Sequence, residues 1–217
     1  MKVHLIWDLD GTLVDSEPEI LATIKQALCT VHLSVDDAYA PLRIGPPLPA
    51  VLRNSFPKEV LNDAGIAIVI GEFRKIYDAS DFENTRPYDG IDEMIKSDAY
   101  RHTVITNKPN FAARRLIDKK GWRKYISDVL SPDSLPCLTG RELTKIELFQ
   151  HFMSRHLHCR TVGIGDMAGD ADCAHTVGIP AIGVLWGAGT QKELEDAGCD
   201  AIVSDTHELT ETLQEWT

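Results

Sequence analysis

The sequence contains little cysteine, and its cysteines are scattered. No two of them are spaced as Cys-x-x-Cys, and their number is odd: Cys29, Cys137, Cys159, Cys173 and Cys199. A disulfide framework or a cysteine-rich zinc site needs paired cysteines at short, regular spacings. We therefore expect free thiols in a reducing compartment.

Long hydrophobic runs are also missing. No apolar stretch approaches the roughly 18 to 20 residues that a membrane-spanning helix needs. The amino terminus, Met1-Lys2-Val3-His4, runs directly into an apolar segment without the pattern of a signal peptide. These features predict a soluble cytoplasmic protein that has no membrane partner.

Positive charge is scarce. The chain has 22 lysines and arginines against 33 aspartates and glutamates, which gives a formal net charge of −11. The resulting electrostatic field repels polyanions and argues against nucleic acid as a partner. It stays compatible with a small phosphorylated substrate in a local pocket. Hydrophobic residues make up 43% of the 217 residues, which suits one globular domain, with or without a large insertion.

Short apolar runs alternate with amphipathic stretches along most of the chain. We expect strands at residues 3–7, 103–105, 161–164, 181–184 and 201–203, and helices at residues 110–119, 141–155, 168–176, 191–197 and 207–216. Glycines follow three of these helices, as is common at helix ends: Gly121, Gly178 and Gly198. The alternation predicts an α/β fold, a Rossmann-like doubly wound parallel sheet.

Residues 16–83 interrupt this alternation. They contain three helix-like stretches, at 18–31, 49–56 and 66–77, and no convincing buried strand. We interpret residues 16–83 as a helical cap inserted after the first strand of a catalytic core made of residues 1–15 and 84–217. Such an insertion is expected near the carboxyl ends of the strands, where open α/β sheets bind ligands.

Two acidic pairs directly follow expected strands: Asp8 with Asp10, and Asp166 with Asp170. Each has an ordinary explanation, because Asp-x-Asp-Gly is common in turns and aspartate is common at helix N-caps. In a parallel sheet, however, both pairs reach the same edge. Carboxylates gathered there repel each other unless a proton or a cation lies between them, and Mg²⁺ is the cation that we expect.

Polar residues follow a third expected strand, and a lysine precedes a later helix. Thr106 and Asn107 lie where helix amides attract anions, although either residue also serves as a simple cap. Lys145 lies near the start of an expected helix, and its alternative role is a solvated surface lysine.

These segments resemble the motifs of the haloacid dehalogenase-like hydrolases. Asp8-Leu9-Asp10-Gly11-Thr12-Leu13-Val14-Asp15-Ser16 is similar to the first motif, Thr106-Asn107-Lys108-Pro109 to the second, Lys145 to the third and Gly165–Asp170 to the fourth. Further segments resemble the phosphoglycolate phosphatase branch: residues 174–189 and 44–48, and Phe73-Arg74 followed by Tyr77. The resemblance covers nearly the whole chain and implies a Rossmann-like core with a helical cap.

The resemblance also implies roles for individual residues. Asp8 is the implied nucleophile that forms an aspartyl-phosphate, and Asp10 is the implied general acid and then base. The implied Mg²⁺ ligands are Asp8, the Asp10 backbone carbonyl, Asp166 and Asp170. The implied phosphate-binding residues are Gly11, Thr106 and Asn107, with Lys145 neutralising charge.

Two arginines are further candidates for the site. The branch usually has proline after its third-motif lysine, where this chain has Ile146, so Arg141 is the alternative cation at this motif. Arg43, beside Ile44-Gly45 in the expected cap, is a candidate for contacting a substrate carboxylate or second phosphate. It is equally compatible with a surface position.

The leading functional hypothesis is a Mg²⁺-dependent phosphatase that hydrolyses a small, phosphoglycolate-like phosphomonoester through an aspartyl-phosphate. Nucleotides, pyrophosphate and sugar phosphates are alternative substrates. A phosphomutase of the β-phosphoglucomutase type shares all four motifs and is the second hypothesis. A phosphoaspartate signalling module is the third, although its acceptor aspartate would not be expected beside a hydrolytic acid. The sequence leaves the oligomeric state open.

Overall fold

The computed structural model describes residues 2–135, 140–156 and 160–216. The chain divides into two compact units, one made of Met1–Asp15 and Pro87–Thr217, the other of Ser16–Arg86. The second division therefore lies three residues after the sequence-based position at Glu83. The assignment of the two units as catalytic core and cap stays a prediction.

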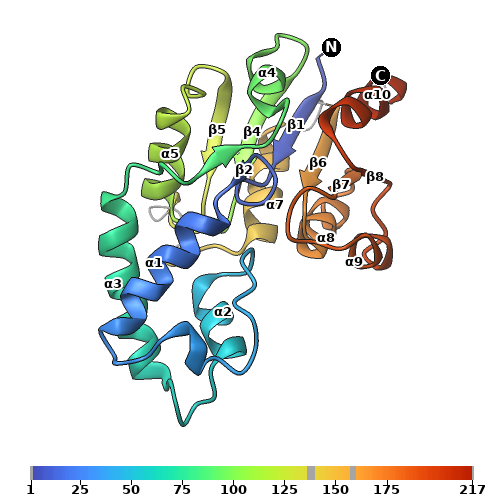
Figure 1. Cartoon of the computed structure of the whole chain (residues 1–217). Helices are drawn as coiled ribbons and strands as arrows, with labels where there is room; N and C mark the ends of the chain where they lie inside the picture. The colour runs from blue at the N-terminus through green and yellow to red at the C-terminus, as the bar shows by residue number, and fades with distance from the viewer. Residues whose placement is uncertain (1, 136–139, 157–159, 217) are drawn as a thin grey trace. The chain divides into compact units, whose positions relative to one another are not determined.

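A six-stranded parallel sheet forms the centre of the first unit (Figure 1). Its order is β5-β4-β1-β6-β7-β8, with β1 at His4–Trp7, β4 at Arg101–Ile105, β5 at Ile126–Leu130, β6 at Thr161–Gly165, β7 at Ala181–Val184 and β8 at Ala201–Val203. The chain builds outward from β1 through β4 to β5, and then returns to the other side of β1. This order confirms the predicted doubly wound α/β fold.

The helices of this unit are α4 at Ile91–Lys96, α5 at Asn110–Lys119, α7 at Lys145–Arg155, α8 at Ala168–Thr176, α9 at Gln191–Asp196 and α10 at Thr206–Glu215. The expectation for residues 141–155 was wrong at its start. A capping box sets the observed start, because Thr144 Oγ1 accepts the Glu147 N–H while the Glu147 carboxylate accepts the Thr144 N–H. Lys145 is consequently the first residue of α7.

Strand β5 and helix α4 were not expected from the sequence. Ser127 and Asp128 interrupt the apolar pattern of β5 with two exposed residues, because this strand lies at the edge of the sheet. At this edge Val129 has both backbone groups satisfied locally. Its N–H donates to Asp128 Oδ1 at 2.8 Å, and its carbonyl accepts from Arg114 Nη2 at 2.9 Å.

The main core of this unit joins α7 and α8 to the sheet. Its buried residues are Ile6, Ile105, Leu130, Leu143, Leu148, Phe149, Phe152, Ala171, Cys173, Ala174, Ile179 and Ala181. At Gly163 a Cβ atom would lie only 2.8 Å from the Ala174 Cβ. A side chain at Gly163 would therefore push α8 away from β6. This close packing positions Asp166, which follows β6, and Asp170, which lies on α8.

The second unit is helical, with α1 at Glu17–Cys29, a 3₁₀ turn at Val35–Asp37, α2 at Leu48–Ser55 and α3 at Asp63–Ala79. The largely buried Glu19 joins α1 to the segment after α3. One of its carboxylate oxygens accepts a hydrogen bond from the Ser80 hydroxyl, and the other accepts one from the Asn84 N–H at 2.9 Å.

Two short strands, β2 at Val14–Asp15 and β3 at Arg86–Pro87, form a separate small sheet.

Three described cysteines, Cys29, Cys173 and Cys199, have free thiols. Cys137 and Cys159 lie outside the described residues. Within the described ranges, none of the helices combines the length and the apolar character required to cross a bilayer.

Two buried histidines make the fold sensitive to acid. Burial is the main cause that lowers the pKa of both His4 and His102 to about 4. The neutral His102 Nδ1 accepts a hydrogen bond from Trp7 Nε1 at 3.0 Å, which a protonated Nδ1 could not accept. Because the pKa is lower in the folded state, the unfolded chain binds protons first as the pH falls from about 6.5 to about 4.

We predict that the substitution His102→Asn weakens this acid sensitivity. The asparagine Oδ1 keeps an acceptor near Trp7 but has no proton to gain. Between pH 7 and pH 4.5 the wild type should lose about 1–3 kcal/mol more unfolding free energy than the variant does. Urea unfolding followed by tryptophan fluorescence measures this difference. Parallel losses in the two proteins would contradict the prediction.

Candidate active site

The candidate site lies at the carboxyl edge of the parallel sheet. Asp8 follows β1, Thr106 follows β4 and Asp166 follows β6, and β1 lies between the other two strands. Backbone hydrogen bonds extend the sheet to these residues, because the Asp8 N–H donates to Ile164 O at 2.9 Å and the Thr106 N–H donates to Leu130 O at 3.1 Å. The sheet therefore fixes the backbone of the site.

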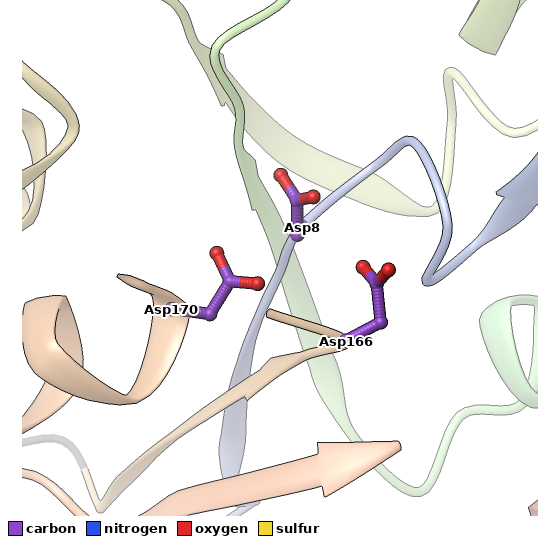
Figure 2. Close-up of side chains that lie close together, drawn as sticks. All are labelled: Asp8, Asp166 and Asp170. Atoms are coloured by element: carbon purple, nitrogen blue, oxygen red, sulfur yellow. The ribbon is translucent and has the colours of Figure 1, made fainter. Parts of the chain in front are cut away.

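Three carboxylates come together at this edge. Asp8, Asp166 and Asp170 each provide a carboxylate oxygen that lies within 4.8 Å of those of the other two. Figure 2 shows the side chains converging from the ends of β1 and β6 and from α8. Three oxygen donors from three carboxylates form the kind of ligand set that Mg²⁺ prefers, so the residues fit such an ion.

Hydrogen bonds to both oxygens hold the Asp166 carboxylate. Its side chain is buried, with Oδ1 accepting from Thr12 Oγ1 at 2.8 Å and Oδ2 accepting from the Ala188 N–H at 2.9 Å. A Cβ atom at Gly187 would lie 2.3 Å from the Gly11 carbonyl oxygen and 2.4 Å from the Asp166 Cβ. The loop after β7 packs this closely only because residue 187 is glycine.

Lys145 provides a positive charge within the cluster. Its Nζ lies 2.6 Å from Asp8 Oδ1 and 2.6 Å from Asp170 Oδ1, and its side chain is only 9% exposed. Arg141, the alternative that the sequence left open, instead donates to the Glu147 carboxylate with a side chain that is 60% exposed. The structure thus brings Lys145 to the carboxylates of Asp8 and Asp170, whereas Arg141 pairs with Glu147.

The ionisation of the cluster reflects its burial. Burial raises the pKa of the Asp8 carboxyl to about 8; Lys145 opposes this shift, and Asp170 and Asp166 add to it. Burial also raises the pKa of Asp166 to about 6, helped by Asp170 and opposed by the hydrogen bonds from Ala188 and Thr12. For Lys145, burial opposes the positive charge, but Asp170 and Asp8 outweigh it and raise its pKa. One lysine therefore leaves the carboxylates short of positive charge.

Asp10 belongs to a second ion pair. Lys108 Nζ donates to Asp10 Oδ1 at 2.8 Å and to Oδ2 at 3.0 Å. Lys108 was not among the residues predicted to act at the site. Its place in the Thr-Asn-Lys-Pro segment was the one available signal, since that segment follows a strand at the same sheet edge.

The residues expected to bind the phosphate or the rest of the substrate lie on three separate segments. Gly11 lies in the loop after Asp10, with a φ of 86°. Thr106 is buried and its Oγ1 accepts the Lys108 N–H at 3.1 Å, while Asn107 is partly buried beside it. Arg43 belongs to the other unit, where its side chain is exposed between the 3₁₀ turn and α2.

Known proteins resemble this chain over most of its length. The family model described as haloacid dehalogenase-like hydrolase matches residues 5–184. Over 193 residues the chain is 29% identical to the phosphoglycolate phosphatase of Xylella fastidiosa, covering 84% of this chain and 80% of that protein. It is 27% identical over 199 residues to a 5′-nucleotidase of Pseudomonas aeruginosa, covering 88% and 86%.

A solved structure shows the same fold over the full length. A protein from Clostridium acetobutylicum, described as a predicted phosphatase, superposes with a TM-score of 0.83 at 26% identity. The match covers 99% of each chain.

The charge balance predicts how the variant Lys145→Met behaves. Without the ammonium, buried carboxylates face each other unpaired, so we expect a loss of about 3 kcal/mol in unfolding free energy at pH 8. The folded-state pKa of Asp8 is already raised, so protonation relieves the repulsion as the pH falls. The deficit should therefore be smaller at pH 5.

Denaturant unfolding at the two pH values measures the deficit. Arg141→Met serves as the matched control, because its exposed pair with Glu147 contributes little to stability. A Lys145→Met deficit that is equal at pH 5 and pH 8 would count against the charge argument.

Proposed function

The chain belongs to the haloacid dehalogenase-like hydrolases, and we propose that it is a Mg²⁺-dependent phosphatase that hydrolyses a small phosphomonoester through an aspartyl-phosphate. The observation that carries this proposal is the position of Asp8. It follows strand β1 and pairs with Lys145, and one of its carboxylate oxygens lies within 4.8 Å of those of Asp166 and Asp170. This arrangement supports a nucleophile next to a cation and a set of metal ligands.

The proposed reaction has two displacements on phosphorus. In the first, a carboxylate oxygen of Asp8 forms a bond to phosphorus while the ester P–O bond breaks, and the leaving alkoxide takes a proton from Asp10. In the second, water gives a proton to Asp10 and attacks phosphorus, which breaks the bond to Asp8 and releases phosphate. Asp8 and Asp10 then return to their starting forms.

The other proposed roles follow from charge and donor chemistry. Lys145 already contacts Asp8 and would stabilise negative charge on the phosphoryl oxygens during transfer. Gly11, Thr106 and Asn107 would position the phosphate from the two neighbouring loops. These groups need little reorganisation, because the sheet fixes the backbone to which they belong.

We assign the metal site to Asp8, Asp166 and Asp170, with the Asp10 backbone carbonyl as a further ligand. When bound there, Mg²⁺ would neutralise charge on the carboxylates and polarise the phosphoryl group. The support is the oxygen-only donor set, in which three carboxylates gather around a single lysine, Lys145.

The proposed substrate class is a small, phosphoglycolate-like phosphomonoester. The relatives named phosphoglycolate phosphatase and 5′-nucleotidase support monoesters of small metabolites. We further assign Ser16–Arg86 the role of a cap that selects the substrate, with Arg43 as its candidate contact for a substrate carboxylate or second phosphate. This cation on the cap would favour substrates with a second anionic group.

The first test is phosphate release from a panel of monoesters with Mg²⁺, comparing wild type with Asp8→Asn. The panel includes phosphoglycolate, nucleoside monophosphates and sugar phosphates, with pyrophosphate added. We expect release from the wild type and a fall of kcat of at least about 10³-fold in the variant, because the amide is not a nucleophile.

Asp172→Asn is the matched control, since Asp172 is exposed on the same helix as Asp170 and should keep normal activity. Conversion of a sugar 1-phosphate to its isomer without phosphate release would contradict the phosphatase and indicate a mutase. No release from any substrate would also contradict the proposal.

A second test concerns the metal alone. Saturating Mg²⁺ should raise the thermal midpoint of the wild type by several degrees, because an ion that binds only the folded state stabilises it. In Asp166→Asn this increase should fall to less than half, since one charged ligand is lost. Asp172→Asn again provides the control. Equal increases in wild type and Asp166→Asn would exclude Asp166 as a ligand.

A further inference from the structure

Lys108, which pairs with Asp10, has no role in the reaction described so far. Both side chains are largely buried, at 4% and 14% exposed, and both Asp10 oxygens accept from the same Nζ. Lysine is rarely buried to this extent without a specific partner. Lys145 contacts Asp8 and Asp170, so the two lysines serve different carboxylates.

The backbone holds Lys108 in place from both sides. Its N–H donates to Thr106 Oγ1 at 3.1 Å, which closes a tight turn at the end of β4. The next residue, Pro109, is the N-cap of α5, and its ring fixes the local backbone. Burial and this turn have already removed most of the freedom of the lysine chain, so the ammonium is a pre-organised donor.

Asp10 lies directly before a turn of the chain. The chain turns after it, with the Gly11 N–H donating to Val14 O at 2.9 Å, and Gly11 adopts a positive φ. A carboxylate in such a turn could rotate away from the site. The contacts from Lys108 Nζ to both oxygens favour a single rotamer of the Asp10 side chain, and this rotamer fixes the position of the carboxylate.

We infer that Lys108 is a positioning residue that holds the Asp10 carboxylate in place as the base of the second displacement; this inference rests on the proposed function. Asp10 can take a proton from the attacking water only while its carboxylate stays in position. With a substrate whose leaving group needs no proton, loss of Lys108 should therefore slow hydrolysis of the aspartyl-phosphate more than its formation.

The experiment separates these two steps with p-nitrophenyl phosphate. Its leaving group departs without a proton, so formation of the aspartyl-phosphate does not depend on Asp10. In Lys108→Met we expect the burst of p-nitrophenol to keep its rate within about threefold, while steady-state turnover falls about 10–100-fold. Intact-mass spectrometry during turnover should show the phosphorylated chain accumulating, as in Asp10→Asn.

Other roles of Lys108 give different results. A residue that only stabilises the fold would lower burst and turnover together, and a residue that binds phosphate would raise KM; either result overturns the inference. Lys108→Gln, which keeps a donor but no charge, provides the same comparison if Lys108→Met does not fold. Lys192→Met, at an exposed lysine paired with Asp196, is the matched control.

The two proposals fail in distinguishable ways. If the wild type forms no phosphorylated chain and releases no phosphate, the proposed function is wrong. If the wild type shows both and Lys108→Met keeps the wild-type ratio of burst to turnover, only the role of Lys108 is wrong.

Discussion

Repulsion among buried carboxylates is the constraint around which the first unit is organised. Asp8, Asp166 and Asp170 lie together where little solvent screens their charges. Such a cluster persists only if nearby groups supply compensating charge and hydrogen bonds. Lys145 supplies the charge, and Thr12 and the Ala188 N–H supply hydrogen bonds to Asp166. Because one lysine faces three carboxylates, the cluster loses stability through repulsion. For the same reason, a divalent ion would bind favourably there.

The sheet makes this compensation possible over long distances in sequence. Lys145 and Asp8 are 137 residues apart, and Thr12 and Asp166 are 154 apart. The parallel sheet, in which β1 pairs with β4 and β6, brings the loops and helix starts that carry these residues to one edge. Hydrogen bonds between strands therefore set the geometry of the site, and the loops contribute its chemistry. The long-range pairing also explains why no single segment forms this site alone.

Much of this arrangement could be predicted from the sequence, because it follows from local patterns. The bounds of α5 and α8 were predicted correctly, and the strand order gathers the motif residues at one edge. Strand β5 was missed since an edge strand needs no continuous apolar pattern, and Asp128 belongs to its exposed side. A capping box decides between Arg141 and Lys145, because it makes Lys145 the first residue of α7. The Lys108–Asp10 pair depends on how two loops meet in space. Hydrophobic periodicity shows neither the capping box nor the meeting of the loops.

The edge at β5 also bears on how the protein behaves at high concentration. Edge strands with unsatisfied peptide groups can recruit strands from other chains and start aggregation. Here the outward peptide groups of Val129 already bond to Asp128 and Arg114. An incoming strand would have to displace a carboxylate and a guanidinium before it could pair. The two charged side chains thus act as a barrier to sheet extension, and they favour solubility without contributing to the chemistry.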